Sequence, residues 1–201
     1  LKAVDSLKQR DVHTARQLFE SDRIINEKRY AIENAILILI ATQQPMAHDL
    51  RILAAMLEVI TELERMGDYA KGIGKVTIRL GDFVLPVPIR EISQMADIGL
   101  NMLHRALTAF VEENPNLAAA IPPEDKLVDQ LYLHIYHSLV SNMIANPSII
   151  DHANLLMWVA HNLERLADRV TNICERTVFI ATGEVMEMET ELTEEEDEDI
   201  E

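Results

Sequence analysis

Two stretches one hundred residues apart contain the residues whose types and spacing are best suited to chemistry. Residues 63–68 and 163–168 each read Leu-Glu-Arg, then two small or apolar residues, then Asp. On a helix this spacing places the Glu and Asp carboxylates four residues apart on one face. The neighbouring apolar residues follow the same helical period, so both pairs are predicted to interrupt a core-facing stripe. The residues concerned are Glu64, Asp68, Glu164 and Asp168.

Two carboxylates at this spacing repel each other, and partial burial costs several kcal/mol per ion unless something compensates the charge. A multivalent cation bound between them is the simplest compensation. For one such pair in isolation, an ordinary solvated acidic face with an Arg beside it is the alternative. The duplication at matching core-facing positions favours a metal site in each half of the chain.

A second polar element is also repeated. Residues 22–26 and 125–129 each place two oxygen-bearing side chains four residues apart, at an offset of 103 rather than 100. The loop between the two polar elements is therefore predicted to be three residues shorter in the second half. Antiparallel packing of the two helices of one half could bring its polar pairs together. The expected ligands are Asp22, Asn26, Glu64 and Asp68 in the first half and Asp125, Asp129, Glu164 and Asp168 in the second.

Oxygen ligands of this kind suit Mg²⁺, Mn²⁺, Ca²⁺ or iron better than a thiolate zinc site. Di-iron carboxylate oxidases also point carboxylates into a helical bundle, but they use Glu-x-x-His. None of the seven histidines has a Glu three residues before it. No Gly-x-Ser-x-Gly, phosphate-binding Gly-rich loop or reactive-cysteine setting is present either, so we expect a protein that is not an enzyme. A metal-free helical adaptor, in which Arg or Lys from other helices neutralises the polar pairs, remains open.

Composition indicates an all-α protein. Aromatic residues make up 4% of the chain, and only six Gly and seven Pro occur in 201 residues. In the second predicted helix Ala15, Leu18, Ile25, Ile32, Ile36 and Leu39 form an apolar stripe. Ser148 and Asp151 resemble a cap for the last helix, and Gly183 is its expected stop. The predicted helices cover residues 1–7, 11–43, 45–80, 89–112, 117–145 with a break at Pro122-Pro123, and 148–181.

Charge and repeats suggest how the chain is divided. We expect a first bundle with a truncated first helix at residues 1–85, a second bundle at 86–183 and an acidic, disordered tail at 184–201. The turn-rich residues 81–88 are the expected linker. Eleven acidic and no basic residues lie in the tail, so the remainder carries −5 of the total charge of −16. This balance argues against nucleic-acid binding.

The expected location is the cytoplasm. The longest apolar run, residues 35–41, is too short to cross a bilayer, so direct membrane insertion is not expected. Residues 1–10 contain no apolar core of a signal peptide. The single cysteine, Cys174, permits no internal disulfide and fits a reducing compartment.

The repeated Glu-Arg-x-x-Asp motifs, the Asp-x-x-Ile-Asn and Asp-x-x-Val-Asp elements, and Gln-Pro-Met-Ala-His-Asp-Leu-Arg at residues 44–51 together resemble the PhoU family of bacterial phosphate-uptake regulators. The resemblance runs from about Asp11 to Ala181. It implies two tandem three-helix bundles, a homodimer and multinuclear metal sites of iron, manganese, magnesium or zinc on the carboxylate motifs. It also implies negative control of phosphate transport through a phosphate ABC transporter, by way of its ATPase, and a sensor histidine kinase.

The two halves depart from the family pattern in different ways. The family commonly has an Asn four residues after the motif Asp, which the second half keeps as Asn172, whereas the first half has Gly72. The second half lacks Asp-Leu-Arg and has Ile149-Ile150-Asp151 there. We therefore expect the two metal sites to differ in occupancy or nuclearity. No phosphate pocket is evident, so the phosphate signal is expected to arrive through the transporter and the kinase.

Overall fold

The computed structural model describes residues 1–81 and 89–188, and no strand occurs in these two ranges. The protein is all-α, as predicted from composition. The described residues contain seven α-helices, and two of the connections between them contain a single turn of 3-10 helix. Their bounds are α1 Lys2–Gln9, α2 Val12–Gln43, α3 His48–Leu80, α4 Ile89–Val111, α5 Pro115–Ala119, η1 Pro122–Glu124, α6 Asp125–Ala145, η2 Pro147–Ile149 and α7 Ile150–Thr182.

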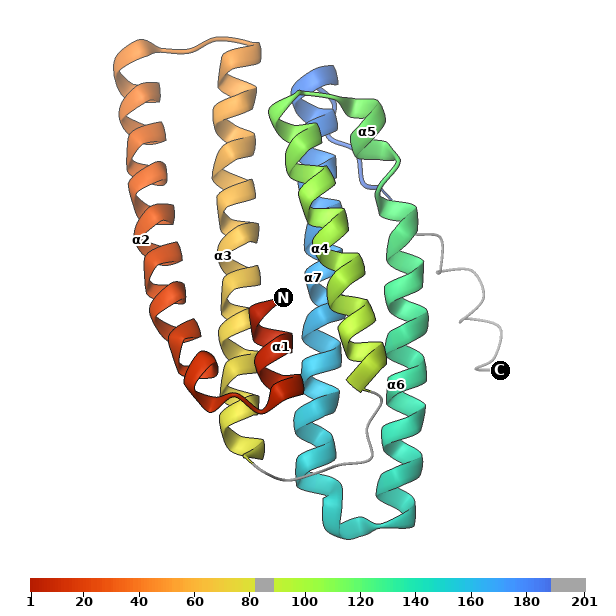
Figure 1. Ribbon diagram of the computed structural model, residues 1–201. Helices are drawn as coiled ribbons and strands as arrows, with labels where there is room; N and C mark the ends of the chain where they lie inside the picture. The colour runs from red at the N-terminus through yellow and green to blue at the C-terminus, as the bar shows by residue number, and fades with distance from the viewer. Residues whose placement is uncertain (82–88, 189–201) are drawn as a thin grey trace.

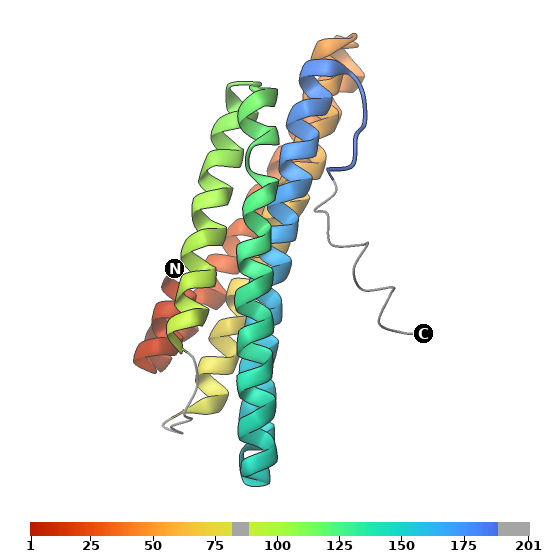
Figure 2. The same ribbon diagram turned by 90° about the vertical axis from the view of Figure 1, so that its right-hand side faces the viewer.

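The helices form two tandem three-helix bundles, which confirms the predicted fold class. Helices α1, α2 and α3 make the first bundle, and α4, α6 and α7 make the second, with the short α5 packed on α4 and α7 (Figure 1). Helices α3 and α7 pack against each other, and in the side view α7 lies in front of α3 (Figure 2). Buried apolar residues form one cluster that reaches from α1 to α7. The expected linker lies almost wholly outside the described residues, so the division at residue 85 stays a prediction.

Helices α3 and α7 are antiparallel, and polar contacts join them along their length. The Arg51 Nε atom donates to the backbone oxygen of Ile180, near the end of α7, at 3.2 Å. Midway along the helices, Arg169 Nη1 lies 3.3 Å from Glu62 Oε2. The two motif-bearing helices are thereby held in a fixed axial register.

Most helix boundaries follow from local chemistry. Asp11 caps α2 by accepting from the backbone N–H groups of His13 and Thr14, at 2.9 and 3.0 Å. The predicted break at Pro122-Pro123 is confirmed as η1, which separates α5 from α6. Gly183 ends α7 with φ 81°, the left-handed conformation that glycine adopts without a steric penalty.

Two predicted helix starts were wrong. Helix α3 begins at His48 rather than Pro45, because Gln44 and Ala47 both adopt φ 49° and turn the chain first. Ser148 does not cap α7. The side chain of Asn146 accepts from the Ser148 N–H at 3.2 Å and begins η2, and α7 follows with no side-chain cap.

The length difference between the halves does not lie in a shorter loop, contrary to the prediction. The connections at residues 44–47 and 146–149 are equally long. Counted from the repeated acidic positions, α2 is one residue longer than α6 at its end, and α3 is two residues longer than α7 at its start. The difference thus falls at helix ends, away from the acidic motifs.

The predicted apolar stripe of α2 is only partly buried. Ala15, Leu18 and Ile36 are buried, but Ile32 is 38% exposed and Leu39 is 45% exposed. In Figure 1 α1 lies beside the lower part of α3, and the exposed residues belong to α2 above it.

Candidate metal centre

In the first repeat a lysine already neutralises part of the acidic set. The Lys71 Nζ atom lies 2.8 Å from Asp22 Oδ2 on α2 and 3.1 Å from Asp68 Oδ1 on its own helix, α3. Asp22 is buried, and Asn26 Nδ2 donates to its backbone oxygen at 3.1 Å. Hydrogen bonds to the two carboxylates raise the pKa of Lys71, so this ammonium group stays charged. Asp22, Asn26 and Asp68 are therefore brought together around an internal cation.

Lys71 does not pair with Glu64, whose side chain makes no hydrogen bond or ion pair within the described residues. The lysine of the first repeat therefore joins Asp22 and Asp68, with Asn26 beside Asp22.

In the second repeat four carboxyl groups lie close together with no lysine between them. Burial, followed by the charges of Asp129, Asp168 and Glu164, raises the pKa of Asp125 to about 7. Burial, followed by Asp168 and Asp129, raises the pKa of Glu164 to about 7 as well. The pKa of Asp129 is also raised, by burial and by Asp168. All four predicted ligands of this repeat therefore act on one another electrostatically.

Asp168 is the most accessible member of this second-repeat set. The residue is exposed, yet burial of its carboxylate is still the largest influence and raises its pKa, against the opposing charges of Arg169, Arg165 and His161. The exposed part of the side chain remains in contact with water, which screens these charges.

The neighbouring arginines face α3 and do not fill the centre of the set. The Arg165 guanidinium lies over the ring of Tyr69 on α3, 5.6 Å from its centroid, and Arg169 pairs with Glu62 of α3. The His161 Nδ1 atom lies 3.2 Å from Glu164 Oε2 but without hydrogen-bond geometry, since that oxygen has no hydrogen-bond partner. The cations at the edge of the set leave its interior negative.

The donor atoms of the second repeat fit a hard cation. Asp125 is 3% exposed, and its Oδ1 atom is buried without a hydrogen-bond partner in the described residues, as is Glu164 Oε2. Such atoms are costly to bury unless a proton or a metal ion satisfies them. Within the same residues no three His, Cys, Asp or Glu side chains already converge at metal-binding distances. Binding would therefore require side-chain rotation. The first repeat does not fit in the same way, because Lys71 occupies the position between its carboxylates.

Sequence reasoning found both acidic sets but missed the residues that distinguish them. Lys71 follows Asp68 by three residues, and His161 precedes Glu164 by three, so helical spacing could have revealed both. Tyr132 was also missed. Its pKa is raised by burial and then by the charge of Glu164. The centroid of its ring lies 6.1 Å from that of the His161 ring, with the two rings tilted by 46°.

Comparison with known proteins identifies the family of the chain. The PhoU domain model matches residues 1–77 and 92–177, one match for each repeat. A phosphate-specific transport system accessory protein PhoU homolog from Clostridium acetobutylicum is 33% identical over 92% of this chain and 85% of its own length. The homolog from Streptococcus pneumoniae serotype 4 is 32% identical over 93% and 87%.

Solved structures agree with the sequence matches. The PhoU crystal structure from Streptococcus pneumoniae superimposes with a TM-score of 0.85 at 32% identity, covering 92% of this chain and 87% of that one. PhoU from Pseudomonas aeruginosa gives 0.86 at 29% identity, covering 91% and 88%. No helix in the described residues has the length and apolar character needed to cross a membrane. With two domain matches and two tandem bundles of matching structure, the chain belongs to the PhoU family.

Proposed function

We propose that this protein is a metal-dependent regulator of a phosphate-specific transport system, and that its second repeat carries the main metal site. The observation that carries the proposal is the set of four mutually repelling carboxyl groups on α6 and α7, two of whose buried oxygens have no hydrogen-bond partner in the described residues. A bound cation would neutralise these carboxylates and satisfy both oxygens. Iron, manganese, magnesium and zinc are the candidate ions.

The regulatory part of the proposal rests on relatives. The similar proteins from Clostridium and Streptococcus are named as accessory proteins of a phosphate-specific transport system. We propose that this chain acts likewise, in the cytoplasm and as a homodimer. It restrains uptake by contact with the transporter ATPase and a sensor histidine kinase, without catalysing a reaction.

A second function, that of a metal-free structural adaptor, is favoured by the first repeat alone. There a lysine of α3 pairs with Asp22 across helices and with Asp68 on its own helix, which is the kind of internal pairing that an adaptor requires. The two functions therefore make opposite claims about the second repeat. A di-iron oxidase has no such support.

Complementation tests the regulatory proposal. Phosphate uptake is measured in a bacterial host that lacks its own PhoU protein and expresses this chain, E164Q/D168N or the matched variant E64Q/D68N. The wild-type chain and E64Q/D68N should lower uptake, and E164Q/D168N should not. Uptake unchanged by the wild-type chain would refute the regulatory role. Equal restraint by all three proteins would show that regulation does not need the second-repeat site.

Metal analysis tests the binding part separately. Protein purified without chelator should contain metal that is lost in E164Q/D168N. A wild-type protein without metal, whose melting temperature does not respond to Mn²⁺, Mg²⁺, Zn²⁺ or iron, would refute metal binding, because a ligand of the native state must stabilise it.

A further inference from the structure

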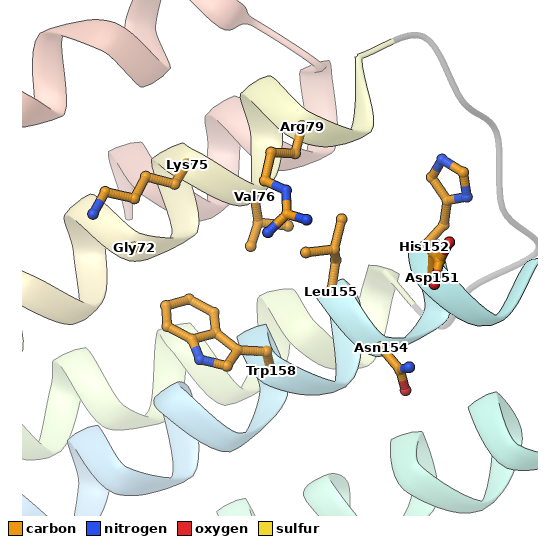
Figure 3. Close-up of a pocket in the computed structure, with 9 residues that line it drawn as sticks. All are labelled: Gly72, Lys75, Val76, Arg79, Asp151, His152, Asn154, Leu155 and Trp158. Carbon is orange, nitrogen blue, oxygen red and sulfur yellow. The ribbon is translucent and has the colours of Figure 1, made fainter.

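A hollow separate from the acidic sets lies between the last turns of α3 and the first turns of α7 (Figure 3). Its volume is about 680 Å³, within the range of small-molecule sites. Helix α3 contributes Gly72, Lys75 and Arg79 to its lining, and α7 contributes His152 and Trp158. None of the predicted metal ligands lines it.

One wall of the hollow is cationic in a protein that is otherwise strongly acidic. Lys75 and Arg79 are four residues apart, on one face of α3, and both are exposed. Neither has an ion pair or a hydrogen bond within the part of the chain that the structure describes. Asp151 is the one carboxylate in the lining, and it lies in the first turn of α7, where the helix dipole offsets its charge. The lining thus carries an excess of positive charge.

The other wall presents an aromatic ring. Trp158 is the only tryptophan in the chain, and 42% of it is exposed. It fits there because position 72 is glycine, since a Cβ at this position would lie 2.2 Å from the Trp158 Cη2 atom. Figure 3 shows the indole beneath Gly72, on the side of the hollow opposite Lys75 and Arg79. Gly72 therefore leaves the space that the indole of Trp158 occupies.

Lysine and arginine near the end of a helix also have an ordinary explanation, because cations complement the negative end of the helix dipole. That explanation requires neither the hollow nor the exposed indole opposite. Anion-binding cations and an aromatic surface around one cavity are the two elements that bind a ligand carrying both phosphate and a ring.

We propose that this hollow binds a nucleotide, with its base against Trp158 and its phosphates held by Lys75 and Arg79. Figure 3 shows the Arg79 guanidinium pointing into the hollow, whereas the Lys75 side chain runs back along α3 past Gly72. Both side chains are long and exposed, so Lys75 can turn toward phosphates that Arg79 binds.

The test uses Trp158 as its own reporter. ADP is titrated into the full chain in the presence of EDTA, so that metal at the acidic sets plays no part, and binding is followed by tryptophan fluorescence and calorimetry. ADP should quench the fluorescence saturably. Adenosine alone and inorganic phosphate alone should each bind at least about tenfold more weakly, since each engages only one wall.

Variants assign the site. K75Q/R79Q should weaken ADP binding at least about tenfold, because it removes both phosphate contacts. The control K8Q/R16Q makes the same change of net charge at exposed positions of α1 and α2 and should bind as the wild type does. W158L, followed by calorimetry with its helicity checked by circular dichroism, should also weaken binding.

Several results would overturn the assignment. These are no saturable ADP binding at millimolar concentration, phosphate or adenosine binding as tightly as ADP, or equal losses in K75Q/R79Q and K8Q/R16Q. Because the titration excludes metal, its failure would leave the proposed metal-dependent function untouched.

Discussion

The two repeats carry the same acidic motif but neutralise it differently. In the first, the ammonium group of Lys71 lies within hydrogen-bonding distance of Asp22 and Asp68. In the second, the corresponding position one hundred residues later is Thr171, which supplies no charge, and the carboxyl groups raise one another's pKa. A duplicated motif therefore does not mean a duplicated site. Whether the motif needs a bound cation depends on whether the chain itself supplies a counter-charge.

The largest expected difference between the repeats is in metal affinity. E164Q/D168N should lose at least about a hundredfold in affinity for Mn²⁺ or iron, because two anionic ligands become neutral. The matched change E64Q/D68N should alter affinity by less than about threefold. At a hundredfold excess over the dissociation constant, metal should stabilise the wild type by about 2.7 kcal/mol. Calorimetry and thermal unfolding measure both effects, and equal losses in the two variants would contradict the comparison.

Removing the internal cation should make the first repeat resemble the second. K71M leaves the buried Asp22 without its partner and should lower the free energy of unfolding of the metal-free protein by about 2 kcal/mol. It should also create a second metal site, so that added Mn²⁺ restores the lost stability. Urea unfolding with and without metal provides the measurement. The control K75M removes an exposed lysine one turn away and should have little effect; a K71M protein with unchanged stability would count against an internal counter-ion.

The dependence of stability on pH should come mainly from the second repeat. The folded-state pKa values of Asp125 and Glu164 are raised to about 7, above their ordinary values of 3.8 and 4.5. The folded state therefore binds more protons than the unfolded state, and stability is lost as pH rises from about 4 to about 7. At about 1.4 kcal/mol per pKa unit, the loss should be on the order of a few kcal/mol. Urea unfolding of the metal-free protein at pH 5 and pH 8 measures it. D125N/E164Q should flatten the profile, whereas a profile as steep as that of the wild type would assign the dependence to other groups.

The smallest expected effect concerns the positions equivalent to the family Asn, which are Gly72 and Asn172. G72A gains helix propensity but places a Cβ against Trp158, so the net loss should be about 1 kcal/mol, with a shifted tryptophan emission maximum. Asn172 lies about four turns further along α7 than Trp158, so N172A should leave the tryptophan emission unchanged. A G72A spectrum identical to that of the wild type would show that the indole has room to move.

Much of the fold could be predicted because helical spacing is a local property. The period of the apolar residues located α2, α3, α4 and α7 to within a few residues, and the Pro122-Pro123 break was read from proline chemistry alone. The start of α3 was missed because it depends on backbone turns at Gln44 and Ala47. The start of α7 was missed because it depends on the side chain of Asn146, a residue that helix propensity does not distinguish from its neighbours.

The acidic sets could be predicted because repetition singled them out, and the structure brings Asp22 to Asp68 and Asp125 to Glu164 from separate helices. Their metal content stays a prediction. The hollow could not be foreseen, since Arg79 and Trp158 are far apart in sequence and meet only through the pairing of α3 with α7. Exposure of Ile32 and Leu39 could not be foreseen for a similar reason, because burial along a helix depends on which other helices pack against it.

The antiparallel pairing of α3 with α7 also limits how the length of the chain can vary through evolution. Three contacts join the helices in reverse order of sequence: Arg51 with Ile180, Glu62 with Arg169, and Gly72 with Trp158. Deleting one residue within either helix would rotate everything beyond it by about 100° and separate the remaining partners. Insertions and deletions are therefore tolerated only at helix ends, which is where the three-residue difference between the two repeats is found.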